Sequence, residues 1–405
     1  MKSFEEYASF YKKELTENVM DFWDERCIDY ENGGYFTCFD RFGNLTDTNK
    51  YIWFQGRQLY VYSLLYNRIE KKKEWLDKAW HGYRFLVEKA YAGNGRWHYI
   101  LDQKGTVIEG AISIFSDYHV IQGLAEFALA SADEGCKSLL EECFDVLEEN
   151  MFDPNFKEIY ENTWHEDLIW HDMYLTCLST VESCIPVLGI ERTRRLFDDC
   201  IEKITQCFYD KNEKKIFEAI KRNGGNAFDY PQGTFINPGH SYESLWFIMN
   251  IGVGYNKPEL VKWGLDTVKE INQYSLDKDY GGVYSYLDLY QKDPEPIDWY
   301  KETNTLWHDK VWWCNVEALC CLALAYSISP TAECENEFIK LQEFCFAHFS
   351  DREYGEWYER LDRAGYVKNS DKGTPWKCAF HLARALVFIY TYFSNASLGK
   401  QEIES

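Results

Sequence analysis

The sequence repeats a short extended segment six times along its 405 residues. Each copy is centred on an aromatic or β-branched residue, and successive copies are separated by 57 to 74 positions. Three copies continue into an Asp-x-x-Gly signal, beginning at Asp40, Asp102 and Asp362, which predicts a small β-hairpin. The central residues of the six copies are Tyr35, Trp97, Ile159, Ile216, Val283 and Trp357.

Segments with helical periodicity, apolar at i, i+3, i+4 and i+7, lie between these hairpins. We expect twelve helices, at about 3–20, 54–70, 74–92, 114–131, 134–150, 166–185, 190–208, 238–253, 257–272, 312–327, 334–350 and 376–393. Six hairpins, each followed by two helices, predict an all-α fold, the (α/α)6 barrel, with its hairpins on one rim. We expect a single catalytic domain at 1–393 and a polar, frayed tail at 394–405.

The charge balance restricts the partners. The chain has 66 acidic against 43 basic residues, a formal charge of −23, which argues against nucleic acid or an anionic membrane surface. The sequence contains no run of 18 apolar residues, so no membrane span is expected. The acidic start does not resemble a signal peptide, and we therefore expect a cytoplasmic protein. The 14 cysteines form no CxxC pair, which favours free, buried thiols over disulfides or a zinc site.

Residues suited to proton transfer and charge stabilisation recur at the starts of the helices that follow the hairpins. Because these helices would form the inner ring, their first turns share one rim, and the phase of the repeat predicts that their side chains line one pocket. The residues in those first turns are Arg57, Asp117, His171, His240, Glu317 and His381.

Two histidines stand out among them. His240 and Glu243 are three residues apart, so they share a helix face on which the carboxylate can orient the imidazole. His381 and Arg384 have the same spacing. The alternatives are an exposed histidine at a helix cap for His240, and a buried histidine bonded to a backbone carbonyl for His381. The apolar residues that follow both histidines favour a functional role.

Arg57 and Arg384 each lie in an otherwise apolar run. A guanidinium is costly there unless it faces an acid or a ligand anion. The fork of Arg57 suits a carboxylate or a developing oxyanion. The alternative is a buried ion pair with Glu317 or Asp117, and the two roles are compatible.

Aromatic residues are abundant, with 15 Trp, 30 Tyr and 26 Phe, and a cavity rich in such rings suits a sugar. Trp53, Trp312, Trp313 and Trp376 stand at helix starts, although plain packing is expected for one of the adjacent pair. The run from His165 to Asp172 suggests a metal site, but its histidines are six apart and lack the HExxH spacing, so we expect no metal. His171 and Asp117 are instead candidates for substrate contact. No phosphate-binding motif occurs.

Several runs together resemble the N-acylglucosamine 2-epimerase family, which includes cellobiose 2-epimerases and related aldose–ketose isomerases. The resemblance covers nearly the whole chain and implies the same (α/α)6 barrel. The matching runs begin at Gly33 (Gly-Gly-Tyr-Phe-Thr-Cys-Phe-Asp-Arg), Asp47 (through Gln-Gly-Arg-Gln), Asn237 (Asn-Pro-Gly-His-Ser-Tyr-Glu), Lys310 (through Glu317-Ala-Leu) and Trp376 (through His381-Leu-Ala-Arg-Ala-Leu).

The details point to two branches of the family. The Gln-Gly-Arg-Gln and Asn-Pro-Gly-His forms are closer to the N-acyl type, which interconverts N-acetylglucosamine and N-acetylmannosamine. Trp170-His171-Asp172 and the surroundings of Trp376 are closer to the disaccharide type. Family members often form dimers, and some are activated by nucleotides, for which this chain shows no motif.

The resemblance implies abstraction of the proton at C2 of an open-chain sugar and a cis-enediolate, without a required cofactor. His240 and His381 then exchange protons on opposite faces, and Arg57 stabilises the enediolate oxygen. Glu243 and Glu317 orient bases and hydroxyls, and Arg384 holds the pocket or the substrate.

Three other functions remain open. Protonation of the enediolate at C1 would give an aldose–ketose isomerase. A glycoside hydrolase on the same barrel would use paired carboxylates such as Asp117 and Glu317, but the histidines and arginine do not suit that chemistry. A non-catalytic sugar-binding protein would not need both His240 and His381 facing one cavity.

Overall fold

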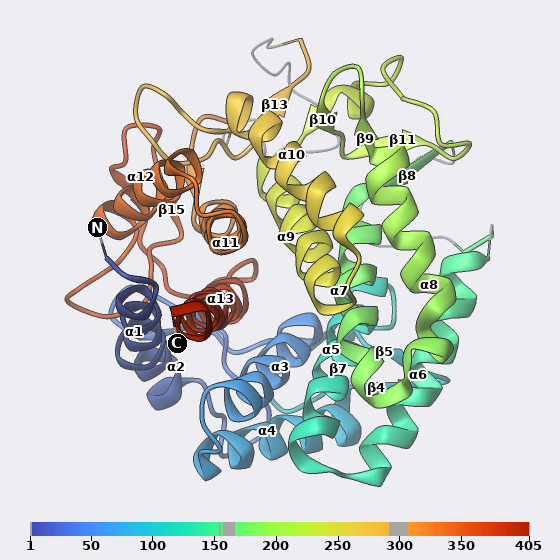
Figure 1. Ribbon diagram of the computed structural model, residues 1–405. Helices are drawn as coiled ribbons and strands as arrows, with labels where there is room; N and C mark the ends of the chain where they lie inside the picture. The colour runs from blue at the N-terminus through green and yellow to red at the C-terminus, as the bar shows by residue number, and fades with distance from the viewer. Residues whose placement is uncertain (1, 154, 157–166, 291–306, 405) are drawn as a thin grey trace.

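The computed structural model describes residues 2–153, 155–156, 167–290 and 307–404, and its helices form a ring (Figure 1). Each inner helix packs against the next, and the last packs back against the first, so the ring closes. The inner helices are α3 (Ile52–Arg68), α5 (Ile114–Ser131), α7 (His171–Leu188), α9 (Pro238–Gly254), α11 (Trp312–Ile328) and α13 (Phe380–Glu404).

A second layer of helices surrounds this ring, and each outer helix packs on one inner helix. The first outer helix packs on α13, so the chain termini complete one pair, as the (α/α)6 prediction requires. The outer helices are α1 (Phe4–Glu14), which continues through a π-helical turn into α2 (Met20–Arg26), and α4 (Lys73–Phe85), α6 (Glu134–Phe152), α8 (Ile190–Glu202), α10 (Pro258–Ser275) and α12 (Ala332–His348).

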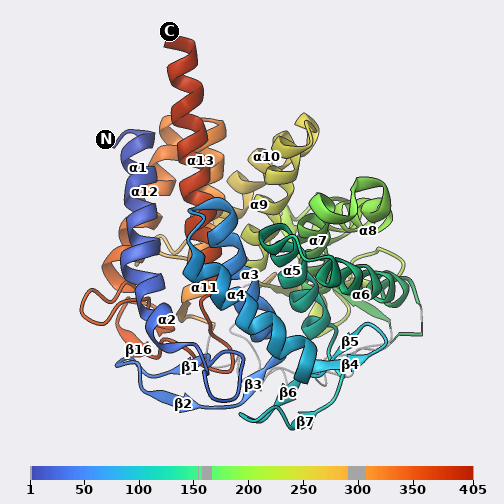
Figure 2. The ribbon, with the colours of Figure 1, turned by 90° about the horizontal axis from the view of Figure 1, so that it is seen from below.

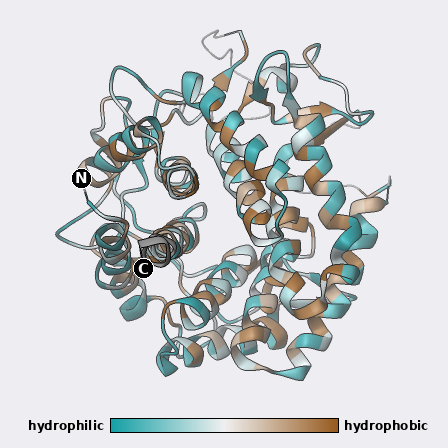
Figure 3. Ribbon diagram, in the orientation of Figure 1, coloured by the Kyte–Doolittle hydropathy of each residue, from teal (hydrophilic) through white to brown (hydrophobic). Residues whose placement is uncertain are grey.

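The two layers differ in sequence pattern for a physical reason. An outer helix has one face on the inner ring and one in water, so polar and apolar residues segregate along α8, where Leu196 and Phe197 are buried but Arg194 is exposed (Figure 3). An inner helix is enclosed by its neighbours, by the outer layer and by the barrel interior. All residues of α11 from Cys314 to Tyr326 are therefore buried.

Short strands gather at one end of the barrel (Figure 2). They form two- and three-stranded antiparallel sheets that join successive helix pairs. The pairs are β1 (Cys38–Phe39) with β2 (Leu45–Asp47), β4 (Tyr91–Gly93) with β5 (Arg96–Trp97), β8 (Leu168–Trp170) with β11 (Ala219–Lys221), β9 (Tyr209–Asp210) with β10 (Lys215–Ile216), and β12 (Phe235–Ile236) with β13 (Leu287–Asp288). The three-stranded sheets are β3 (Lys50–Tyr51), β6 (Ile100–Leu101) and β7 (Val107–Glu109), and β14 (Lys310–Val311), β15 (Arg360–Leu361) and β16 (Val367–Asn369).

The turn signals read from the sequence form hairpin turns. The Asp40 carboxylate accepts hydrogen bonds from the backbone N–H groups of Phe42 and Asn44, at 2.9 and 2.8 Å, and thereby closes the turn between β1 and β2. Asp102 makes the equivalent bonds between β6 and β7. The copy of the repeat around Ile159 lies outside the described residues.

Buried ion pairs anchor the hairpins to the helices. Lys50, Lys310 and Lys372 are fully buried, and their Nζ atoms lie 2.9 to 3.0 Å from the carboxylates of Asp29, Asp277 and Asp351, respectively. Because an unpaired buried ammonium would be costly, each lysine is held to one loop. Two of these lysines immediately precede an inner helix, so the pairs help to fix where α3 and α11 begin.

Two predicted helices have different limits in the structure. Leu168–Trp170 pairs with β11 as strand β8, so α7 begins at His171 rather than near residue 166. The last inner helix begins at Phe380 rather than near residue 376, because Thr374 and Lys377 form a turn. It then continues through Glu404, so the expected frayed tail is helical.

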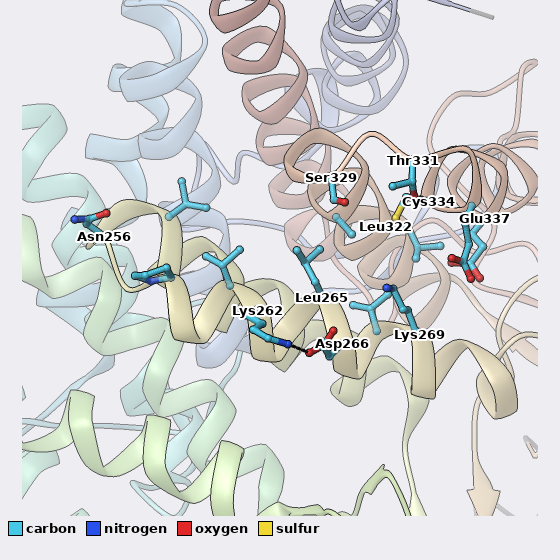
Figure 4. A pocket seen from close by; sticks show the side chains of 17 residues that line it. Asn256, Lys262, Leu265, Asp266, Lys269, Leu322, Ser329, Thr331, Cys334 and Glu337 are labelled. Carbon is cyan, nitrogen blue, oxygen red and sulfur yellow. Dashed lines mark hydrogen bonds and ion pairs between the residues drawn. The ribbon is translucent and has the colours of Figure 1, made fainter.

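All 14 cysteines are free, as expected from their scattered positions, and 12 of them are buried. Within the described ranges, no helix combines the length and apolarity needed to cross a membrane. A cavity of about 500 Å³ lies between α10, α11 and the start of α12 (Figure 4). It is lined by the C-terminal ends of α9 and α11, so it lies away from the rim that carries the hairpins.

A polar contact near the opposite end of the barrel gives a stability prediction. Asn250 of α9 donates to the Glu182 carboxylate of α7 at 2.8 Å, and burial raises the pKa of Glu182 to about 7. When a carboxyl has a higher pKa in the folded protein than in the unfolded protein, the free energy of unfolding falls as the pH rises from the unfolded pKa through the folded pKa.

Glu182→Gln keeps the acceptor for Asn250 and removes this charge. We expect the free energy of unfolding to rise by about 1–3 kcal/mol at pH 8, with a smaller gain at pH 5.5. Urea unfolding at both pH values measures the difference. A gain that is equal at the two pH values would show that Glu182 is not the titrating group.

Candidate active site

Side-chain contacts join three inner helices at the rim that carries the hairpins. Arg384 of α13 is 2 % exposed, and its guanidinium contacts the carboxylates of Glu243 on α9 and Glu317 on α11. The distance to Glu317 is 2.6 Å. His381 bonds to the same Glu317. Four residues from three separate sequence runs therefore form one cluster.

The two ring nitrogens of His381 have different surroundings. Its Nδ1 lies 2.7 Å from Glu317 Oε1, whereas no described residue bonds its Nε2. Burial, reinforced by the positive charge of Arg57, holds the pKa of His381 well below its usual range. Glu317 stays fixed because Trp246 Nε1 also donates to it, at 2.8 Å. A neutral imidazole with a free Nε2 is a competent proton acceptor.

His240 is arranged in the same way on a different carboxylate. Its Nδ1 lies 2.8 Å from Glu218 Oε2, and its Nε2 has no partner in the described part of the chain. Burial alone would lower its pKa, but the charge and hydrogen bond of Glu218 outweigh this effect and raise the pKa to about 9. The same interaction lowers the pKa of Glu218 to about 2 despite its burial. His240 is therefore an imidazolium at neutral pH.

The two histidines flank one tryptophan. The ring of Trp313 lies 5.1 Å from that of His240 and 5.5 Å from that of His381, centroid to centroid. Two imidazoles with pKa values shifted in opposite directions thus face the same part of the rim. Such a pair is the usual arrangement of an acid and a base.

Arg57 is a partly buried cation at the start of α3. Among the described residues it forms no ion pair, so the alternative of a buried pair with Glu317 or Asp117 is not observed. Its Nε donates to His119 Nε2 at 3.1 Å, and its guanidinium lies 5.0 Å from the ring centroid of Trp53. Burial lowers its pKa to about 10, which leaves it charged at neutral pH.

Glycine at position 56 makes this geometry possible. A Cβ there would lie 2.6 Å from the backbone of His119, so only glycine allows α3 and α5 to pack this closely. The close packing brings the neighbouring Arg57 beside His119. Because burial of His119, reinforced by the charge of Arg57, holds the pKa of His119 well below its usual range, the ring stays a neutral acceptor for Arg57.

The remaining tryptophans differ in exposure. Trp376 is 45 % exposed and packs edge-on against Trp53, with centroids 5.7 Å apart. Trp312 is buried, and its ring centroid lies 6.5 Å from that of His381. Trp53, Trp313 and Trp376 are therefore at least partly exposed, whereas Trp312 is buried.

Asp117 and His171 are buried, and both form hydrogen bonds with other residues of the protein. Asp117 accepts from Arg96 Nε at 2.5 Å and from the backbone N–H of Trp97 at 3.0 Å, which ties α5 to strand β5. His171 is 0 % exposed and uses both nitrogens, towards Glu218 and Ser244. The geometry favours supporting roles for these two residues over the substrate contact expected from the sequence.

Sequence reasoning missed two residues of the site. Glu218 lies in the fourth copy of the hairpin repeat, and His119 lies two positions after Asp117. Each was adjacent to a recognised signal. Neither could be assigned a partner, because the contacts come from other helices.

The donor atoms of two groups lie within 4.8 Å of one another, as a metal site would require: His171, Glu218 and His240, and Glu243, Glu317 and His381. Hydrogen bonds account for the first group, in which both histidine Nδ1 atoms face one carboxylate. The second group already contains the cation Arg384. The donor sets are thus satisfied by protons and a guanidinium.

The chain is similar to known proteins over most of its length. The family model described as N-acylglucosamine 2-epimerase matches residues 34–385. The human N-acylglucosamine 2-epimerase is 28 % identical over 379 residues, which cover 91 % of this chain and 86 % of that protein.

Solved structures share the fold. Cellobiose 2-epimerase from Bacillus thermoamylovorans superposes with a TM-score of 0.81 at 20 % identity, covering 95 % of this chain and 99 % of that chain. A D-mannose isomerase superposes with a TM-score of 0.80 at 18 % identity, covering 95 % and 97 %. On the strength of the family match over most of its length, this chain belongs to the N-acylglucosamine 2-epimerase family of sugar isomerases.

Proposed function

We propose that this protein epimerises a sugar at C2 through a cis-enediolate, with N-acetylglucosamine and N-acetylmannosamine as the preferred pair. The observation that carries the proposal is the pair of histidines close to Trp313, each with Nδ1 on a carboxylate and with no bond to Nε2 from any described residue. The choice of sugar rests on the similarity to N-acylglucosamine 2-epimerases over 91 % of the chain.

The protonation states of the two histidines suggest the direction of proton transfer. Neutral His381 accepts the C2 proton of the open-chain aldose, and the electron pair moves towards the C1 carbonyl oxygen. The guanidinium of Arg57 stabilises the negative charge on that oxygen. The His240 imidazolium returns a proton to the opposite face of C2, which inverts the configuration. His381 then holds the C2 proton and His240 has given its proton to the product, so proton exchange with solvent restores both histidines before the next turnover.

The supporting residues have separate tasks in this scheme. Glu317 orients His381, and Arg384 holds the carboxylates of Glu317 and Glu243 in place. The exposed face of Trp376 and the ring of Trp313 offer stacking surfaces to the sugar. No step requires a metal or an organic cofactor. A homodimer and a cytoplasmic location remain expectations from the sequence.

Incubation of the protein in D2O with N-acetylglucosamine, N-acetylmannosamine, mannose or cellobiose, followed by NMR, tests the proposal. We expect deuterium at C2 of an epimerised product.

His240→Asn and His381→Asn should each lower kcat by about 10²–10⁴-fold, the usual contribution of a positioned acid or base. Each variant should still exchange the C2 proton of one epimer, since one base remains.

Three outcomes would contradict the proposal. A ketose product would make the protein an aldose–ketose isomerase. Cleavage of cellobiose without exchange at C2 would indicate a hydrolase. Full turnover by either asparagine variant would remove that histidine from the mechanism.

A further inference from the structure

Glu218 connects the starts of two inner helices through its backbone. It lies between β10 and β11 and is 4 % exposed. Its carbonyl accepts from the backbone N–H of His171, the first residue of α7, at 2.9 Å. Its N–H donates to the carbonyl of Phe235, in the strand before α9, at 3.1 Å. The position of its side chain is therefore fixed relative to both helices.

The side chain divides its two oxygens between two histidines. Oε1 lies 3.2 Å from His171 Nδ1, and Oε2 lies 2.8 Å from His240 Nδ1. An ionised carboxylate only accepts, so both Nδ1 atoms carry hydrogen. His171 Nε2 is then the acceptor for the Ser244 hydroxyl, at 2.8 Å. The network thus fixes the tautomer of His240 and leaves Nε2 as its proton-exchanging atom.

Glu218 and Glu317 differ in their charged partners. Glu218 faces only histidines among the described residues, whereas Glu317 also faces an arginine. Among the described residues, the ion-pair partners of Glu218 are His171 and His240 alone. Glu317 shares its charge with Arg384. The other titratable groups that act on His240 are Asp172 on α7, Glu243 on its own helix and His381 on α13.

We propose that Glu218 is a positioning residue for the epimerisation, which holds His240 in one tautomer and favours its imidazolium form. This role rests on the proposed function, in which His240 exchanges a proton with C2. His171 and Ser244 act through Glu218 by fixing the carboxylate from the other side.

Glu218→Gln tests the kinetic consequence. The amide can accept from one histidine only, and it carries no charge. We expect kcat to fall by about 100-fold or more. The alkaline limb of the pH–rate profile, where His240 loses its proton, should move to lower pH because the stabilising charge is gone. Glu218→Asp keeps the charge and should restore part of the rate and the position of the limb.

Glu182→Gln is the matched control, because it removes a partly buried carboxylate from the same barrel, with Asn250 as its hydrogen-bond partner instead of a histidine. It should leave the pH–rate profile unchanged. A Glu218→Gln protein with the wild-type profile would overturn the proposal. So would equal shifts in both variants, since these would indicate a general effect of lost charge.

A measurement without turnover separates this inference from the proposed function. NMR titration of histidine labelled with ¹⁵N, assigned with His240→Asn, should show a lower pKa for His240 in Glu218→Gln than in the wild type. The same spectra report whether the variant is folded. If His240 shifts but no sugar exchanges at C2, the contact stands and the proposed function fails. If sugars exchange but His240 keeps its pKa and tautomer, Glu218 does not have this role.

Discussion

Arg384→Met should lower the free energy of unfolding by about 3–5 kcal/mol, because it breaks a buried ion-pair network by removing one partner. Arg384 lies against the carboxylates of Glu243 and Glu317 and is 2 % exposed. Methionine fills similar space but leaves two buried negative charges without a cation. The shift in urea midpoint between wild type and variant measures the loss.

An exposed arginine gives the matched control for this change. Arg194→Met removes an ion pair with Glu191 on the surface of α8, where solvent screens the interaction, so the urea midpoint should hardly change. If the buried contact is responsible, the double variant Arg384→Met/Glu243→Gln should recover part of the lost stability. Equal midpoints for Arg384→Met and Arg194→Met would contradict the assignment.

Arg57→Met should have the opposite pattern, with kcat lowered by about 10²–10³-fold and stability little changed. Arg57 makes no ion pair within the described part of the chain, so its removal strands no carboxylate. Its charge is free to stabilise the enediolate oxygen. Steady-state rates and the urea midpoint, measured on the same preparation, separate the two effects.

A second variant, Arg57→Lys, and a second measurement, exchange of the C2 proton, test the role of Arg57 further. Lysine keeps the charge but loses the planar fork and the bond from Nε to His119, so an intermediate rate is expected. Since exchange and epimerisation share the enediolate, Arg57→Met should slow both by the same factor. Fast exchange with slow epimerisation would mean that Arg57 acts on a later step.

The two arginines illustrate what the sequence could and could not predict. Both were recognisable as cations in apolar helix starts, and both lie at the predicted rim. Their separate roles depend on neighbours from other helices. Arg384 meets two carboxylates, whereas Arg57 meets a neutral histidine because Gly56 lets α5 approach.

The sequence by itself determined the barrel and the rim. Hairpin turns and helix periodicity are local, so a repeat of them specifies six helix pairs and the phase that places His240, His381 and Arg57 at inner-helix starts. It also led to the family. Only the tertiary structure decided which carboxylate serves which histidine. Glu218, 22 positions before His240, and Glu317, on a different helix from His381, are paired with these histidines by packing between neighbouring elements of the ring. Such pairing contributes to the opposite pKa shifts of the two histidines.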